Sequence, residues 1–191
     1  MRRVAIALLL AACHLPGAAQ EAFSLPALMQ ALAAVPVAQA RFTEVRHLRL
    51  LRAPLELQGT LRYVRPDRLE RRVQSPYEET IVIEGNRVSV DDPARGERRS
   101  YALASLPAAY AMVESLRATL AGDLVALERH YEVRLAGGRE AWTLSLTPRD
   151  AGGAGLLTEV RLQGAAARIT RIEYLEAAGD RTTVTIRELQ P

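Results

Sequence analysis

Apolar and polar residues alternate in short runs through the middle of the chain, from Gly59 to Asp91. Turn residues separate the runs at Arg65-Pro66-Asp67, Ser75-Pro76 and Glu84-Gly85-Asn86. Alternation with a period of two is typical of strands that have one apolar face, and proline and Gly-Asn pairs mark the turns between them. The pattern predicts an antiparallel meander in this region.

The rest of the chain adds strands on both sides of this meander and two helical segments. Strands are expected at 40–50 and 55–64, and again at 131–135, 142–146, 156–162, 169–177 and 181–189. Apolar residues recur at helical spacing between Ser24 and Pro36 and between Ser105 and Ala121, and Asp123 caps a short turn after the second helix. With about ten strands against two substantial helices, the expected fold is mainly β with α.

An antiparallel sheet of this size must curve, and its apolar face must be covered. The two predicted helices can cover it from one side as a lid. Periodicity leaves open whether the space between sheet and lid is a packed core or a cavity. No linker divides the sequence, so we expect a single domain over residues 20–191.

The N-terminus has the pattern of a secretory signal peptide over residues 1–19. Met1-Arg2-Arg3 is basic, Val4–Ala12 is apolar but too short to span a bilayer, and small residues precede Gln20. We therefore expect export to the periplasm. Leu10-Ala11-Ala12-Cys13 also fits a lipoprotein signal, and an outer-membrane lipoprotein anchored through Cys13 is the alternative.

Composition and charge argue against several other classes of protein. Without residues 1–19 the chain keeps 23 of its 25 basic residues, all of them arginine, against 22 acidic residues, a net charge of +1. There is no basic helix or stacking platform, so no nucleic-acid partner is expected. His47 and His130 are isolated, and no nucleophile or metal-binding motif is present, so neither an enzyme, a cofactor nor a metal site is expected. A monomer is expected.

Several motifs resemble the LolA-type periplasmic carriers of outer-membrane lipoproteins. Phe42-Thr43-Glu44, Gly59-Thr60-Leu61, Arg65-Pro66-Asp67 and Ile83-Glu84-Gly85-Asn86 occur in the order and spacing of that family, with Pro76 between the last two. The resemblance is close from about residue 40 to 91 and looser beyond. It implies an incomplete β-barrel closed by a helical lid, whose hydrophobic cavity receives acyl chains.

The resemblance also implies a function and a set of site residues. The expected function is transfer of a lipoprotein or lipid-linked cargo from an inner-membrane donor to an outer-membrane acceptor, as a chaperone in outer-membrane biogenesis. The inward faces of the strands then supply the cavity residues Phe42, Leu57, Leu61, Tyr63 and Leu69. Arg65 continues the inward row of its strand, and the resemblance implies that it bonds to the lid as a gate.

The sequence also departs from the family pattern. Where such carriers place aromatic residues in the second strand of the meander, this chain has Leu69 and Arg71. An inward Arg71 makes one wall of the cavity polar or shifts the strand register. Another amphiphile, such as a lipid-linked pigment or glycolipid precursor, therefore stays open as the cargo. A non-carrier envelope-assembly module with a filled core is the remaining alternative.

Overall fold

A computed structural model describes residues 23–149 and 157–189. The predicted signal peptide and Cys13 lie outside these residues. Within the described part of the chain, no helix is long and apolar enough to cross a membrane.

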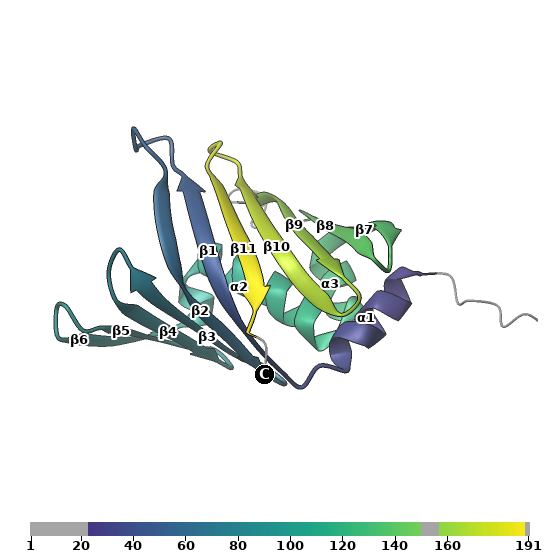
Figure 1. The fold of residues 1–191 in the computed structure, drawn as a ribbon, viewed down its shortest axis with the longest axis horizontal. Helices are drawn as coiled ribbons and strands as arrows, with labels where there is room; N and C mark the ends of the chain where they lie inside the picture. Colours follow the sequence, from purple (N-terminus) through teal and green to yellow (C-terminus); the bar gives the residue numbers. More distant parts are fainter. Residues whose placement is uncertain (1–22, 150–156, 190–191) are drawn as a thin grey trace, which may run out of the picture.

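In the described part of the chain, eleven antiparallel strands form one curved sheet that does not close (Figure 1). Their order across the sheet is β6-β5-β4-β3-β2-β1-β11-β10-β9-β8-β7, so two meanders meet where β1 pairs with β11. The strands are β1 Val37–His47, β2 Leu55–Val64, β3 Arg68–Ser75, β4 Glu79–Glu84, β5 Arg87–Asp92, β6 Glu97–Ala102, β7 Tyr131–Gly138, β8 Ala141–Pro148, β9 Leu157–Ala165, β10 Arg168–Glu176 and β11 Arg181–Glu188.

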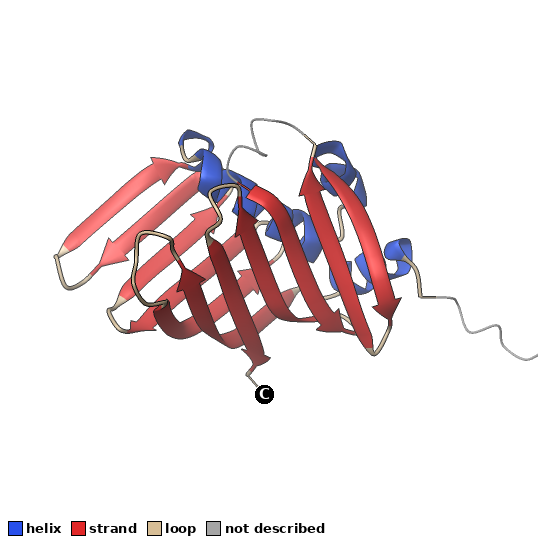
Figure 2. Cartoon of the chain, turned by 90° about the horizontal axis from the view of Figure 1, so that it is seen from above, coloured by secondary structure: helices blue, strands red, loops and turns tan. Residues whose placement is uncertain are grey.

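The α-helices of the described residues, three in number, lie on one side of this sheet (Figure 2). They are α1 Leu25–Ala33, α2 Pro107–Ala121 and α3 Leu124–His130, and a short 3₁₀ turn, Leu103–Ser105, precedes α2. The Ser24 side chain accepts a hydrogen bond from the Ala27 amide at the start of α1, and Asp123 caps α3 by accepting one from Ala126 at 2.9 Å. These caps satisfy amide groups that have no partner within the helix.

Gly122 allows the helices to pack closely. It ends α2 in the left-handed region at φ 69°, and a Cβ added there would lie 2.3 Å from the Met29 carbonyl oxygen of α1. Only glycine fits both the conformation and the contact. The C-terminal end of α2 therefore rests directly on α1.

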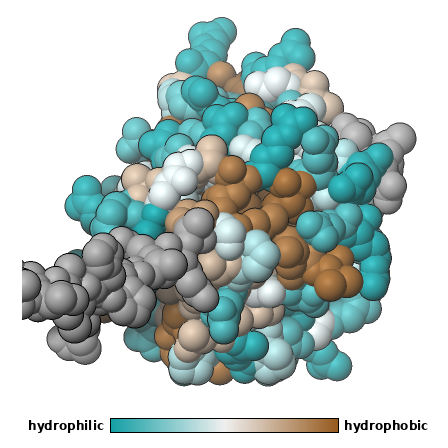
Figure 3. All heavy atoms as spheres, turned by 90° about the vertical axis from the view of Figure 1, so that its right-hand side faces the viewer, coloured by the Kyte–Doolittle hydropathy of each residue, from teal (hydrophilic) through white to brown (hydrophobic). Residues whose placement is uncertain are grey.

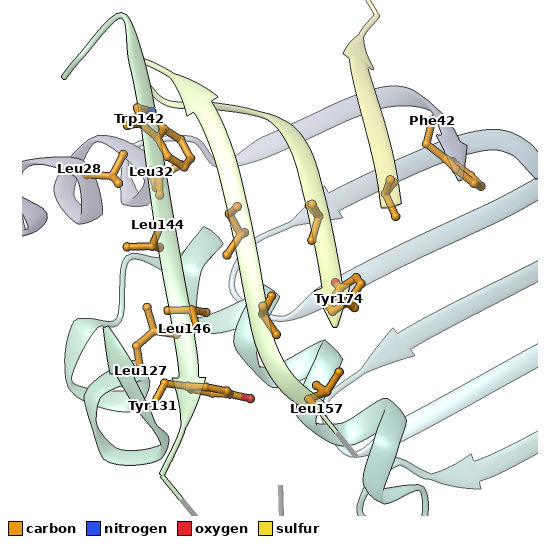
Figure 4. Packing of buried hydrophobic residues seen from close by; sticks show 14 of the residues in the cluster. Leu28, Leu32, Phe42, Leu127, Tyr131, Trp142, Leu144, Leu146, Leu157 and Tyr174 are labelled. Atoms are coloured by element: carbon orange, nitrogen blue, oxygen red, sulfur yellow. The ribbon is translucent and has the colours of Figure 1, made fainter. Parts of the chain in front are cut away.

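Most of the hydrophobic core lies at the end of the sheet formed by β7–β9, under α1 and α3. Trp142 packs against Leu28 and Leu32 of α1, and Leu146 against Leu127 of α3 (Figure 4). The Trp142 indole donates to the Ala166 carbonyl at 2.9 Å, so its one polar atom is satisfied. The outer surface at this end is mostly hydrophilic around one exposed group of apolar side chains (Figure 3).

The predicted fold class is confirmed, with two differences in detail. The sequence pattern missed β6, whose residues Glu97-Arg98-Arg99-Ser100-Tyr101-Ala102 carry no apolar alternation because this edge strand is largely exposed. The turn expected after Asp123 is a helix, α3, which buries Leu127 completely. Both differences concern short elements whose apolar spacing is weak or brief.

Candidate lipid-binding cavity

A cavity of about 560 Å³ lies between the inner face of the sheet and α2. Apolar side chains make up most of its wall. Representative residues are Leu61, Leu69, Ile81 and Ile83 from the sheet and Met112 and Leu116 from α2. The volume is typical of small-molecule sites, which measure roughly 300–1,000 Å³.

Three of the five residues predicted to line the cavity do so: Leu61, Tyr63 and Leu69. Phe42 and Leu57 also lie on the inner face but belong to the hydrophobic core, with exposed fractions of 3% and 0%. The alternation on β2 was therefore read in the correct phase. The alternation could not show which inward residues line the cavity and which are buried in the core by their neighbours.

Gly59 shapes the wall beside Phe42. A Cβ at this position would lie 1.9 Å from the Arg72 carbonyl oxygen and 2.9 Å from the Phe42 ring. The Phe42 ring therefore takes the space in front of Gly59. The guanidinium carbon of Arg71 lies over this ring, 5.0 Å from its centroid, in a cation–π contact.

Arg71 faces the cavity, which decides between the two consequences expected of it. Cross-strand pairing places Arg71 between Leu61 and Ile81, so the inward phase of β3 holds and the wall is polar at this point. Its guanidinium pairs with Glu44 at 2.9 Å and with Glu79 at 3.5 Å.

Glu44 is the centre of this charged group. Its carboxylate is also paired with Arg46, and the side chain is only 6% exposed. A carboxylate this deeply buried is stable as an ion only with such partners. Two arginines and two glutamates thus form a charge-balanced network on the otherwise apolar wall.

The expectation that Arg65 gates the lid is not met in this structure. β2 ends at Val64, so Arg65 lies in the exposed β2–β3 turn rather than at the end of the inward row. Its amide donates to Pro36, but its side chain makes no hydrogen bond to another described residue. The prediction continued the row of inward side chains one residue beyond the end of the strand, into the turn formed with Pro66.

An arginine on the lid, and not Arg65 of the sheet, connects the lid to the sheet. Arg117 of α2 donates to the Gly85 carbonyl at 3.1 Å and pairs with Asp67 at 3.1 Å and Glu114 at 2.7 Å. Asp67 also accepts the Gly85 amide at 3.0 Å. Arg117 is 13% exposed and Asp67 is 38% exposed, so this lid latch, Arg117 with Asp67 and Gly85, is partly shielded from water.

A second contact ties the beginning of the lid to the sheet. The Asn86 side chain accepts the Ala104 amide at 2.9 Å, and the Asn86 carbonyl accepts the Leu103 amide at 2.8 Å. The β4–β5 turn therefore holds α2 near its start and, through Gly85, near its middle. This turn was recognised in the sequence, but nothing in its pattern showed that it would contact the lid.

Two ionisable groups of the cavity wall have shifted pKa values. Burial raises the pKa of Tyr174, and the charge of Glu44 raises it further. Burial also raises the pKa of Glu176, followed by Asp180, while Arg46 lowers it. Among the described residues, no group of three or more His, Cys, Asp or Glu side chains could hold a metal ion. The arrangement is an apolar container with a polar area on one wall.

Comparisons with known proteins agree with this architecture. The family model of outer membrane lipoprotein carrier proteins, LolA-like, matches residues 17–187. No curated protein matches the chain in sequence.

Similar solved structures are all distant in sequence. An uncharacterized conserved protein from Thermus thermophilus has a TM-score of 0.51 at 12% identity, with 84% of this chain and 83% of that chain covered. A LolA superfamily protein from Nitrosomonas europaea has a TM-score of 0.48 at 11% identity, with 89% and 95% covered. The structural likeness therefore shows the fold alone, whereas the family model covers most of the sequence. The chain belongs to the LolA-like family of outer membrane lipoprotein carrier proteins.

Proposed function

We propose that this protein carries a lipoprotein or another acylated amphiphile through the periplasm, with the acyl chain held in the cavity. The single observation that supports this most is the apolar cavity of about 560 Å³ under α2. If a methylene occupies about the volume of a water molecule, roughly 30 Å³, a chain of about 19 carbons fills it. One acyl chain of an inner-membrane lipid or lipoprotein therefore fits.

The wall explains why such a site would take acyl chains and not an enzyme substrate. Aliphatic side chains line the cavity from β2, β3, β4, β5, β10 and β11 and from the lid. A hydrocarbon chain placed against them leaves water, which is favourable. The family is one of carriers by its description, which favours binding and release over chemistry. Passage from an inner-membrane donor to an outer-membrane acceptor follows from the same proposal.

The binding step can be tested with an apolar fluorophore such as N-phenyl-1-naphthylamine. The purified protein should bind it with micromolar affinity, and a palmitoylated peptide should displace it whereas the same peptide without the acyl chain should not. Ile83→Glu should abolish binding, because a charge would be buried between Leu69 and Val88 without a partner. Leu61→Glu is a weaker test, since Arg71 lies opposite and could pair with the new carboxylate.

Thr80→Glu is the matched control, because it places the same charge on the opposite face of β4, beside Arg72. A folded protein that binds no amphiphile would instead support the filled-core envelope module. The anchored alternative is separate, and intact mass decides it: a product that starts at Cys13 with added diacylglyceryl mass would identify a tethered acceptor.

A further inference from the structure

A row of three polar side chains crosses the inner wall of the cavity. Tyr174 on β10 is the cross-strand partner of Thr182 on β11, and Thr182 is the partner of Arg46 on β1. Partners on one face of a sheet lie about 5 Å apart, so these side chains are neighbours. All three line the cavity, and we call them the polar row.

Among the described residues, no hydrogen bond joins the hydroxyl group of Tyr174 or Thr182 to a protein partner, and no fully enclosed side-chain oxygen lacks one, so these two hydroxyl groups are open to the cavity. Tyr174 is 7% exposed and Thr182 is 5% exposed, so both are more than nine-tenths buried. Other buried polar groups do have partners: Tyr131 donates to the Ala111 carbonyl at 2.9 Å, and Trp142 donates to Ala166. A buried hydroxyl normally finds such a partner, so one that faces a cavity is available to a ligand.

The charge around the polar row limits the kind of group that it can bind. Arg46 and Arg71 are neutralised by Glu44 and Glu79, so a full anion would meet two carboxylates as well as two guanidinium groups. The Tyr174 hydroxyl keeps its proton, because burial and Glu44 both raise its pKa, and it is therefore a hydrogen-bond donor. These features suit a neutral group that accepts hydrogen bonds.

We propose that the polar row binds the carbonyl oxygen of an acyl ester or amide, while the hydrocarbon chain lies along the apolar wall of β3–β5. This inference rests on the proposed function, since it names the chemistry of the cargo held in the same cavity. The ester or amide links an acyl chain to its head group in lipids and in lipidated proteins alike. The polar row thus fixes the end of the chain, and the apolar wall accepts its length.

The proposal predicts a preference between ligands of equal carbon number that differ in whether they carry an ester or amide group. Methyl laurate and tridecane, in competition with the bound naphthylamine, form such a pair, and N-methyl lauramide tests the amide. The unaltered protein should bind the ester and the amide more tightly than the hydrocarbon. In a variant with Tyr174→Phe and Thr182→Val, affinity for the ester should fall by about fivefold for each lost hydrogen bond, and affinity for tridecane should not fall.

Tyr131→Phe is the matched control, because the hydroxyl that it removes bonds to Ala111 and lies outside the cavity wall. It should leave the preference for the ester unchanged. Equal weakening of ester and hydrocarbon in the double variant, or no weakening of either, would overturn the polar row while leaving the proposed function intact. Failure of the unaltered protein to bind any of these ligands would overturn both.

Two further ligands distinguish the source of the carbonyl. A dodecanoyl peptide and a dodecanoyl lysophospholipid carry the same chain on different head groups. The double variant should have a lower affinity for whichever of the two ligands the unaltered protein binds. The ligand that the unaltered protein binds more tightly identifies the cargo as protein-linked or lipid.

Discussion

The two ends of the sheet differ in what covers their inner faces. On β7–β9 the inward side chains pack under α1 and α3 together with α2, and Trp142, Leu144, Leu146 and Leu162 are at most 1% exposed. On β3–β5 Val73 and Val88 are buried, but the inward residues Leu69, Ile81, Ile83 and Val90 line the cavity under α2 and are only half-buried. The core therefore lies where α1 and α3 join α2 over the sheet, and the cavity lies where α2 covers it.

The largest effect should come from truncating one leucine at each end. Leu144→Ala removes a fully buried side chain and should lower the free energy of unfolding by about 3 kcal/mol, within the usual range for such changes. Leu69→Ala, which opens an existing cavity, should cost less than about 1 kcal/mol because little packing is lost. Urea unfolding measures both.

Ligand affinity should show the opposite order. Leu69→Ala should weaken binding of the naphthylamine, whereas Leu144→Ala should leave it unchanged at temperatures where the variant is folded. Equal destabilisation by the two substitutions would mean that the β3–β5 end is packed like the β7–β9 end, contrary to the comparison.

A smaller effect is expected where the lid meets the hollow end. Arg117→Met removes the lid latch, whose bonds to Asp67 and Gly85 are charge-assisted and partly shielded. Amide hydrogen exchange in α2 should therefore quicken by about tenfold, the effect of one to two kcal/mol. Arg65→Met is the control and should leave exchange in α2 unchanged, because Arg65 is exposed in its turn.

If both substitutions speed exchange equally, the lid is not held by Arg117 alone, and the gate role expected of Arg65 regains support. If neither does, apolar contacts between α2 and the wall hold the lid closed.

The smallest effect concerns the outer face at the packed end. Hydrogen bonding and charge from Arg171 lower the pKa of Glu173 in spite of its burial, with further lowering by Arg161 and Arg181. A folded-state pKa below the unfolded value contributes stability above the unfolded pKa and loses it as pH falls through the folded pKa. Glu173→Gln should therefore lose less than about 1 kcal/mol at pH 7, and the difference from the parent should shrink in acid.

Urea unfolding at pH 7 and in acid checks this, with Glu132→Gln as a control in an exposed ion pair with Arg134. A constant difference between Glu173→Gln and the parent at both pH values would contradict the assigned linkage.

The sequence was most informative where a single strand decides the outcome. The alternation on β2 placed Leu57, Leu61 and Tyr63 on the inner face, because side-chain direction in a strand depends only on its own backbone. The prolines and glycines of the turns indicated the strand boundaries, because they too act through their own backbone conformation. The signal peptide, Cys13 and the domain limits at residues 20–191 stay predictions.

Features that depend on how elements meet in space could not be predicted in this way. Glu44 gave no signal as a buried charge, since its partners Arg46 and Arg71 are identified only by the pairing of β1, β2 and β3. Arg117 follows Leu116 in the predicted second helix, and the helical spacing could not show which of the two side chains faces the sheet. Whether apolar faces enclose a core or a cavity depends on the helices that cover them, which lie far away in the sequence.

The unclosed sheet has a mechanical consequence. A closed barrel has a radius fixed by its number of strands and their stagger, so its interior cannot widen without breaking ladder hydrogen bonds. Within residues 23–149 and 157–189, β6 and β7 are the edges of the sheet and do not pair with each other, and the hollow end lies next to β6. The sheet can flatten or curl at β3–β6 with every ladder intact. A larger cargo would then be accommodated by elastic bending of the wall, at a cost spread over many small dihedral changes.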